Sequence, residues 1–179
     1  HEYDNNGNEI WRSSPEMVKT FGRDHTNRIV TYADQQTAYA YLHAPSGERL
    51  AKINTTTGAS QWFLPDGSDV LNDYNLLPGG VYGPVASYVN EPGTNVKIAR
   101  YDDATGDPGF YIRDGFGSTF KVLDLNQGTV DQYHFSRTGE KIFAQAVEPN
   151  RFMFRQLSED SESGLIDQFG RAYDPEQGR

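Results

Sequence analysis

The sequence predicts an all-β fold, made of tandem antiparallel β-hairpins joined into a curled or spiralling sheet. Turn-forming residues recur along the whole chain, and the segments between them alternate between apolar and polar side chains. Aromatic residues make up 13% of the chain, with 11 tyrosines and 10 phenylalanines. Aromatic side chains favour strands, and a period of two residues is typical of a half-buried strand.

Turn signals separate the expected strands almost without interruption. Each contains Gly, Pro, Asn or Asp, which tolerate a positive φ or pre-set the turn. The clearest signals lie at residues 4–8, 45–48, 56–58, 65–67, 77–80, 91–93 and 104–106. Further along, Gly106, Gly117, Gly128 and Gly139 follow one another at intervals of eleven residues. A turn spacing of about 8–12 residues is typical of all-β proteins.

Side chains alternate between two faces in the segments between these turns. Tyr39 and Tyr41 share one face of their segment, and the small or aliphatic neighbours share the other. Such alternation suits a sheet with one wet face. The clearest expected strands are residues 28–32, 37–43, 49–54, 120–124 and 130–135, the last two paired across the turn at 126–128.

Helical signals are sparse. Ser14 and Pro15 could cap and begin one helical turn over residues 14–19, which Gly22 would end quickly. No segment keeps a helical apolar spacing over three turns, and no domain boundary is evident. We therefore expect one structural unit over residues 1–179, belonging to a longer chain. The most polar stretch, residues 158–164, predicts an exposed hairpin tip.

The charge and composition exclude several classes of function. The net charge is −9 and the isoelectric point is about 4.8, whereas nucleic-acid binding requires a basic face. An anionic membrane surface is disfavoured for the same reason. No apolar run approaches membrane-spanning length, so we expect neither nucleic-acid binding nor membrane insertion. The chain has no cysteine, which excludes disulfides, thiolate metal sites and a cysteine nucleophile.

Several motifs occur in a fixed order along the chain. A Tyr-Asp-x-x-Gly-Asn unit opens it at residues 3–8, Asn-Arg-Ile follows at 27–29, and Gly-x-Arg-Leu-x-Lys at 47–52. The hairpin motif at 114–119 leads to Asp124, Gly128 and Tyr133, and residues 170–179 read Gly-Arg-Ala-Tyr-Asp-Pro-Glu-Gln-Gly-Arg. In this order, the motifs resemble the rearrangement-hotspot (Rhs) or YD-repeat family, and specifically its Rhs-associated core region.

This resemblance implies a fold and a function. Proteins of the family form a large hollow β-shell, in which Tyr-Asp hairpins build a sheet that spirals around a cavity. Bacterial members enclose a C-terminal toxin and deliver it by secretion systems or toxin complexes, and animal relatives use a similar shell in cell-surface adhesion. The resemblance makes the following residues structural motif positions: Tyr3, Asp4, Gly7, Asp114, Gly117, Ser118, Thr119, Asp124, Gly128, Tyr133, Gly139, Tyr173, Asp174, Pro175 and Gly178.

The chain departs from the family pattern at a few positions. Phe116 stands where the family has leucine, and residues 159–164 replace a Tyr-Asp-Pro-x-x-Gly unit. The excursion from Pro78 to Gly93 is longer than is typical. Many family members cleave themselves with a pair of aspartates. Asp160 aligns with one member of that pair, and the other would lie beyond Arg179.

Physical chemistry gives the Tyr-Asp pairs a structural reading. A tyrosine ring packs while its hydroxyl stays hydrated, and an aspartate after it can accept bonds from the turn backbone. We therefore take Tyr3-Asp4, Tyr101-Asp102 and Tyr173-Asp174 as hairpin anchors rather than catalytic pairs.

The sequence gives little support for a metal site or a catalytic site. The four histidines lack metal-ligand spacing, and His43 and His134 fall in expected strands. The stretch Gly-Phe-Gly-Ser-Thr at 115–119 lacks the closing glycine of a nucleophile elbow. The adjacent carboxylates Asp102 and Asp103 would point to opposite faces of a strand. We predict no catalytic, cofactor-binding or metal-binding residues and no cofactor.

Three functions remain as hypotheses. The first is a structural β-shell segment that encapsulates a toxin or other polypeptide, whose partners are the remainder of its own shell, or other copies, and the cargo. The second is an extracellular surface assembly protein, an adhesin or filament subunit that associates through sheet edges. The third is the remnant of an aspartic self-cleaving core. We expect a secreted or cell-surface protein of bacterial origin that is not an enzyme.

Overall fold

The chain forms one long antiparallel sheet and one short one, and this confirms the all-β prediction. The computed structural model describes residues 1–15, 17–67, 69–147, 150–168 and 171–178. The large sheet has 14 strands, and each strand pairs with its neighbours in chain order. The small sheet has the order β15-β16-β17. The described residues include no α-helix, only the 3₁₀ turn η1 (Phe154–Gln156).

The strands are short near the beginning of the chain and longest in its middle. The large sheet contains β1 (Glu2–Tyr3), β2 (Glu9–Ser13), β3 (Val18–Arg23), β4 (Ile29–Ala33), β5 (Ala38–His43), β6 (Arg49–Asn54), β7 (Ser60–Asp66), β8 (Asp69–Leu77), β9 (Val81–Asn90), β10 (Lys97–Asp102), β11 (Pro108–Arg113), β12 (Thr119–Leu123), β13 (Thr129–Phe135) and β14 (Lys141–Gln145). The small sheet contains β15 (Ser158–Glu159), β16 (Ile166–Gln168) and β17 (Arg171–Tyr173).

One turn design recurs along the large sheet. In the first hairpin, the N–H of Asp4 donates to the carbonyl of Asn8, and the N–H of Gly7 donates to the carbonyl of Asp4. The same pair of backbone bonds begins at Asp24, Ala44, Asp114, Asp124 and Ser136. Strand register shifts by one residue beside each of these turns. Such bulges increase the local twist, so the turns help to curl the sheet.

The left-handed position of these turns is not always occupied by the glycine that the spacing suggests. Gly117 and Gly139 have φ values of +83° and +93°. In the β12–β13 turn, however, the left-handed residue is Gln127, with a φ of +65°. Gly128 follows it, and a Cβ there would lie 2.9 Å from a carboxylate oxygen of Asp124. In this turn the left-handed residue therefore directly precedes Gly128.

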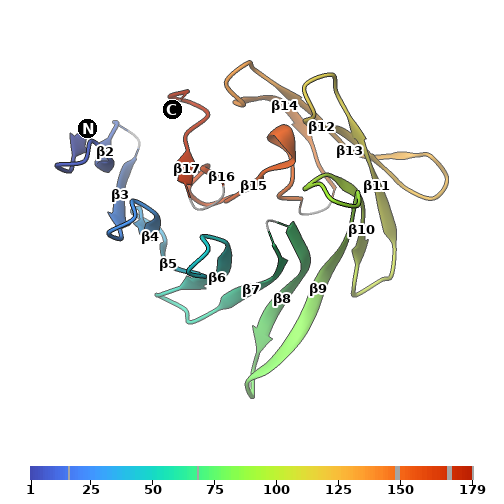
Figure 1. Cartoon of the computed structure of the whole chain (residues 1–179), viewed down its shortest axis with the longest axis horizontal. Coiled ribbons are helices and arrows are strands. Elements are labelled where there is room, and N and C mark those ends of the chain that lie inside the picture. The colour runs from blue at the N-terminus through green and yellow to red at the C-terminus, as the bar shows by residue number, and fades with distance from the viewer. Residues whose placement is uncertain (16, 68, 148–149, 169–170, 179) are drawn as a thin grey trace.

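The large sheet bends into an open arc, and the end of the chain lies inside it (Figure 1). The concave side carries the buried aromatic residues. Tyr32 is 1% exposed and Tyr41 5%, and Leu165 from the end of the chain packs in the same cluster with Phe21 and Ile29. The core therefore lies between the concave face and the C-terminal segment, defined as residues 150–178.

Two local predictions were wrong. The described residues of the expected helical turn at 14–19 form no helix, and Val18 and Lys19 belong to β3. Instead, Ser14 and Met17 exchange backbone bonds in the turn between β2 and β3, while Glu16 lies outside the described residues. Residues 158–164 do form a hairpin turn, but Glu159, Asp160 and Ser163 are 8% or less exposed because this turn faces the concave side.

Other placements agree with expectation. His43 ends β5, and His134 lies in β13. The strands β12 and β13 pair across the 126–128 turn, with Val122 opposite Asp131. Within the described residues, no helix has the length and apolar character needed to cross a membrane.

Candidate functional site

The most unusual chemistry of the molecule lies where the C-terminal segment meets the concave face. Carboxylates of the segment face cations of the sheet at four places. Glu159 pairs with Lys141, Glu162 with Lys52, Asp167 with Arg49 and Asp174 with Arg12. We call this set of contacts, together with the reversed pair Arg151–Asp73 and the Asp160 contacts, the clasp.

Arg151 is the cation that the segment itself contributes to the clasp. Its Nε and Nη2 atoms donate to the two carboxylate oxygens of Asp73 on β8 at 2.8 and 2.6 Å. The guanidinium also lies 4.3 Å from the ring centre of Phe63 and 4.4 Å from that of Phe152. Burial alone lowers the pKa of Arg151, but the Asp73 charge outweighs burial and raises it, so the guanidinium stays ionised.

Asp73 has a second partner in the sheet. The hydroxyl of Tyr88 on β9 donates to Asp73 Oδ2 at 2.9 Å. Burial, reinforced by the Asp73 charge, raises the pKa of Tyr88 well above its usual value. The Asp73 carboxylate is 3% exposed and therefore has its oxygens satisfied by one cation and one hydroxyl. A buried ion pair supported in this way fixes the position of the segment along β8 and β9.

Asp160 is the corresponding anion on the segment. Its Oδ2 accepts bonds from the hydroxyls of Tyr41 at 2.8 Å and Ser163 at 2.6 Å. Lys52 Nζ lies 3.1 Å from Oδ1, and Arg49 Nη1 lies 3.7 Å away. Burial raises the pKa of Asp160, but Arg49 and Lys52 outweigh burial and hold the pKa below its usual value. The carboxylate is thus a paired anion at neutral pH.

Backbone contacts attach the middle of the segment to the sheet. The Thr119 hydroxyl donates to the carbonyl of Phe152 at 2.7 Å, and its N–H donates to the carbonyl of Met153 at 2.8 Å. The side-chain amide of Gln156 accepts from the N–H of Lys97 at 2.9 Å and donates to its carbonyl at 3.1 Å. Gln156 therefore bonds to β10 much as a neighbouring strand would.

The last residues of the segment span the opening of the arc. The carboxylate of Asp174 accepts a bond from Arg12 on β2, near one end of the large sheet. The hydroxyl of Tyr173 donates to the carbonyl of Thr138 at 2.7 Å, in the turn before β14 at the other end. In Figure 1, β17 accordingly lies between the two ends of the arc. The segment therefore ties together strands that are not hydrogen-bonded to each other.

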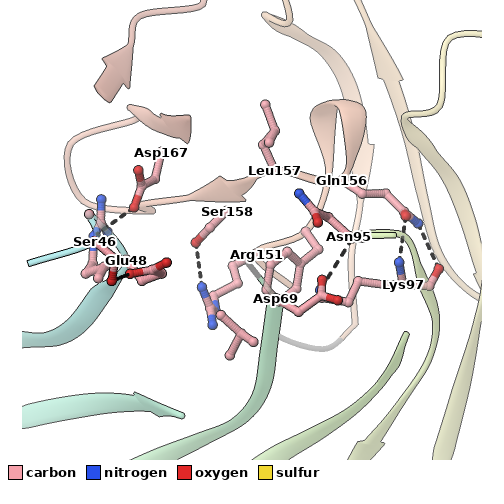
Figure 2. A pocket seen from close by; sticks show the side chains of 14 residues that line it. Ser46, Glu48, Asp69, Asn95, Lys97, Arg151, Gln156, Leu157, Ser158 and Asp167 are labelled. Carbon is pink, nitrogen blue, oxygen red and sulfur yellow. Dashed lines mark hydrogen bonds and ion pairs between the residues drawn. The ribbon is translucent and has the colours of Figure 1, made fainter. Parts of the chain in front are cut away.

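A polar cavity of about 80 Å³ lies beside the clasp. Figure 2 shows Gln156 facing Lys97 on one side, and Arg151 bonded to Ser158 in the middle. Lys97 is 2% exposed, its Nζ lies 3.2 Å from Asp69, and burial lowers its pKa. A larger hollow of about 400 Å³ lies between Tyr88, Tyr133 and Lys141 of the sheet and Glu162 of the segment.

The aspartates of the predicted motif positions all sit in turns. Asp4 Oδ1 accepts bonds from two backbone N–H groups of its turn at 2.9 Å each, and these bonds lower the pKa of Asp4, the Asn8 contacts more than the Asn6 one. Asp114, Asp124 and Asp174 accept equivalent pairs of backbone bonds.

The remaining motif positions divide between turns, sheet and clasp. Gly7 and Gly178 are left-handed turn residues, and Pro175 lies in the last turn. Ser118 accepts a bond from the N–H of Arg155, so with Thr119 it also holds the segment. Tyr133 is 2% exposed on the concave face, whereas Tyr3 on the edge strand β1 is 44% exposed. A Cβ on Gly139 would lie 2.6 Å from the Phe154 ring, so glycine permits this close approach.

The sequence did not identify most residues of the clasp. Arg151 and Asp73 of the clasp, and Tyr88 and Gln156 beside it, belong to no motif. Each of them bonds to a residue 15 to 78 positions away in the sequence. One signal was present: the polar run at 158–164 is acidic, while the inward positions of β6 include a lysine. An acidic segment facing basic strand positions indicates pairing only once the topology is known.

The adjacent carboxylates Asp102 and Asp103 have different partners. Asp102 accepts bonds from two turn N–H groups, whereas Asp103 meets the Ser87 hydroxyl, so these adjacent carboxylates do not converge. In the part of the chain that the structure describes, no group of three or more His, Asp or Glu side chains is placed to hold a metal ion. Ion pairs and backbone bonds of this kind fix one segment on another.

Comparison with known proteins supports the fold. No protein-family model and none of the curated proteins matches the chain. Among solved structures, the crystal structure of TcdB2-TccC3 is similar with a TM-score of 0.69 and 15% identity over 90% of this chain. A variant without the hypervariable C-terminal region gives 0.67 at 13% identity over 90% of the chain. The chain spans 9% of each of these chains.

A third similar structure covers more of the chain. It is a Tc holotoxin pore from Photorhabdus luminescens that carries a TccC3 mutation, with a TM-score of 0.72 and 14% identity. It covers 97% of this chain, which again corresponds to 9% of the larger one. At this identity the likeness shows the fold alone, and that fold agrees with the β-shell implied by the sequence motifs.

Proposed function

We propose that the chain is a wall segment of a hollow β-shell of the YD-repeat type, which encloses a toxin or other polypeptide cargo. The observation that carries this proposal is the curled 14-stranded sheet, whose concave face binds residues 150–178 through the clasp. The likeness to components of Tc toxin complexes supports it. In this proposal the protein is secreted or displayed at a bacterial cell surface.

The geometry explains how such a wall would work. Bulged turns curl the sheet, and aromatic side chains line its concave side, so the wall bends around an interior. Ion pairs then attach the C-terminal segment to the inside of the wall. Further hairpins would continue the sheet at its edges, because an unpaired edge strand otherwise templates aggregation. The partners are therefore the remainder of the shell and the enclosed polypeptide.

Native proteolysis of the natural polypeptide tests this proposal. We expect residues 1–179 and a further polypeptide to survive together, and to be digested together after denaturation. Arg151→Met should remove the protection by loosening the clasp, whereas Arg113→Met, at an exposed arginine on β11, should keep it. The proposal would be contradicted by a natural polypeptide of only 20.1 kDa. It would also be contradicted if all segments outside residues 1–179 were digested as fast as an unfolded chain.

A second function, extracellular assembly through sheet edges, is favoured by one observation. Every residue of the edge strand β14 is exposed, and Ile142 is 70% exposed. A strand of another molecule could add there through main-chain bonds. Exposed edges occupied by copies of the chain in filaments, with no enclosed polypeptide, would favour this function over the shell.

We propose a structural role for Asp160 rather than a part in self-cleavage. Its carboxylate contacts Lys52, Tyr41 and Ser163, and its pKa is held low, whereas an aspartic protease needs two carboxylates that share a proton. Asp160→Asn should lower stability and leave any processing of the natural polypeptide unchanged. Loss of processing without loss of stability would instead support the hypothesis of an aspartic self-cleaving core.

A further inference from the structure

A hollow of about 430 Å³ lies outside the clasp, among the turns of the large sheet. The turn between β11 and β12, the end of β13 with the turn after it, and η1 border this hollow. Its lining combines the aromatic rings of Phe116, Phe135 and Phe154 with the guanidinium groups of Arg137 and Arg155. Pockets that bind small molecules occupy about 300–1,000 Å³ and combine aromatic walls with a few polar groups, so the hollow has the size and the lining of a ligand site.

The aromatic part of the hollow is partly packed and partly open. Phe154 is 7% exposed, and the centre of its ring lies 5.8 Å from that of Phe135. Phe116 is 83% exposed, although a 2.8 Å bond from its N–H to Asp114 Oδ1 fixes its backbone. Two packed rings and one uncovered ring offer a flat apolar ligand a surface to bury.

The guanidinium groups of Arg137 and Arg155 give the hollow a positive charge. Both residues are exposed, and neither forms an ion pair with a carboxylate of the described residues. Asp114 adds a carboxylate to the lining, but its Oδ1 accepts bonds from the turn N–H groups of Phe116 and Ser118. On a chain with a net charge of −9, a local excess of cations favours an anion at this place.

The backbone at Arg155 has an uncommon conformation. Arg155 and Gln156 have φ values of +48° and +53°, which are left-handed values for two successive non-glycine residues. Bonds to Lys97 hold Gln156, and the N–H of Arg155 donates to Ser118 Oγ at 3.0 Å. The guanidinium carbon of Arg155 lies 5.4 Å from the centre of the Phe154 ring. Strained residues of this kind cluster at ligand-binding positions, and here the strain holds a cation beside an aromatic ring.

We propose that this hollow binds an aromatic anion, a flat ring that carries a carboxylate or a phosphate group. The ring packs against the phenylalanines, and the oxyanion accepts bonds from Arg137 and Arg155, whose planar donors fit both kinds of oxyanion. The carboxylate of a polypeptide that ends in an aromatic residue has this chemistry, and so does an aryl phosphate ester. The inference does not depend on the proposed enclosure of cargo, because the hollow shares no residue with the clasp.

Isothermal titration calorimetry of the 179-residue chain with phenyl phosphate tests the proposal. We expect one site with a dissociation constant of about 0.1–1 mM for a ligand of this size. Inorganic phosphate and benzyl alcohol each carry half of the recognised chemistry, so each should bind about tenfold more weakly or worse. N-acetylphenylalanine carries a carboxylate in place of the phosphate, and the tighter of the two aromatic anions shows which oxyanion the site prefers.

Three substitutions locate the site. Arg137→Met and Arg155→Met each remove a guanidinium, and each should weaken the binding of phenyl phosphate about tenfold. Phe116→Ser removes an exposed ring, so it should weaken phenyl phosphate and leave inorganic phosphate unchanged. Arg171→Met is the matched control, because it makes the same change of charge at an exposed arginine on β17 that lines a different hollow. If Arg155→Met changes the circular dichroism spectrum, Arg155→Lys, which keeps the charge without the planar donors, replaces it.

Several results would overturn the proposal. Absence of binding heat for both aromatic anions at millimolar concentrations would show that the hollow is not a site for them. Inorganic phosphate that binds as tightly as phenyl phosphate would show attraction by charge alone. Benzyl alcohol that binds as tightly would show that the arginines take no part. Equal weakening by Arg155→Met and Arg171→Met would assign the binding to the electrostatic field of the whole molecule.

Discussion

Buried ions decide how firmly the C-terminal segment is attached. Asp73 is 3% exposed and Arg151 bonds to both of its oxygens, so each charge depends on the other for the solvation that water no longer provides. Removal of one partner of such a pair costs far more than the net contribution of the pair. The position of the segment therefore depends on a few residues rather than on its many exposed contacts.

We predict that Arg151→Met destabilises the fold by about 3–5 kcal/mol, because it leaves the Asp73 carboxylate buried without a cation. Urea denaturation measures the change. Arg113→Met is the control, because Arg113 is exposed on β11 and should change stability by less than about 0.5 kcal/mol.

Adding Asp73→Asn to Arg151→Met should recover part of the loss. The double variant buries no uncompensated charge, and the amide oxygen can still accept the bond from Tyr88. A double variant less stable than Arg151→Met would contradict this account of the pair.

Buried tyrosines give the molecule an alkaline limit. Burial raises the pKa of Tyr32, Tyr41, Tyr88, Tyr111 and Tyr133. In an unfolded chain these hydroxyls titrate near pH 10. Because the folded pKa values are raised, their stabilising contribution is complete below about pH 10 and is lost as the pH rises beyond it.

We therefore expect two phases when tyrosinate absorbance is followed during alkaline titration. The five tyrosines whose pKa is raised should ionise only above pH 10, together with loss of the circular dichroism signal. A single phase near pH 10 for all 11 tyrosines, with the fold intact, would show that these hydroxyls are not held in a buried environment.

The sequence predicts the contacts of some residues and not those of others. The contacts of turn aspartates such as Asp4 and Asp124 could be predicted because their partners lie within four residues. The contact between Arg151 and Asp73 could not be predicted, because it spans 78 residues and depends on the curvature of the sheet. Contacts between residues close in the sequence can be predicted from it, whereas a buried ion pair across the concave face depends on the topology of the sheet.

Hairpins depend on the acceptor at the first position of each turn. Asp102 accepts bonds from the N–H groups of Ala104 and Thr105, and Asn54 accepts the same bonds in an equivalent turn. Asp102→Ala should lower the free energy of unfolding by about 1 kcal/mol through loss of these bonds, without effect on any activity. Asp102→Asn keeps the acceptor and should behave like wild type. Equal melting temperatures for Asp102→Ala and wild type would refute this anchor role.

The β12–β13 turn offers a test of stored backbone strain. Gln127 has a φ of +65°, a conformation that costs a non-glycine residue about 1 kcal/mol. Gln127→Gly should therefore raise the melting temperature, and Gly117→Ala, at a φ of +83°, should lower it. Thermal unfolding monitored by circular dichroism measures both. A destabilising Gln127→Gly would mean that the glutamine side chain outweighs the strain.

Strand and turn positions were largely predictable, because alternation and turn residues act over a few positions. The turn at 158–164 was misread as exposed because polar composition usually marks solvent contact, whereas here the acidic residues meet Lys52 and Lys141. The turn at 14–17 was misread because Ser-Pro can begin a helix, but β2 and β3 on either side pair with each other. In both places the neighbouring strands override the local preference.

The large sheet is an open arc, and contacts on its concave side connect its two ends. Its 14 strands pair only in chain order, so nothing in the large sheet itself joins β2 to the turn before β14. Asp174 and Tyr173 make that connection through Arg12 and Thr138. The curvature of the sheet follows from the bulged turns at its edges, and the ion pairs on its concave side hold the C-terminal segment in place.

Electron cryomicroscopy of the natural polypeptide tests the central proposal most directly. The account predicts that the 14-stranded sheet continues beyond its edge strands into further hairpins, which surround a cavity filled with density for an additional polypeptide. A reconstruction in which both edges of the sheet end in solvent and no cavity is enclosed would contradict the assignment of this chain as part of a shell.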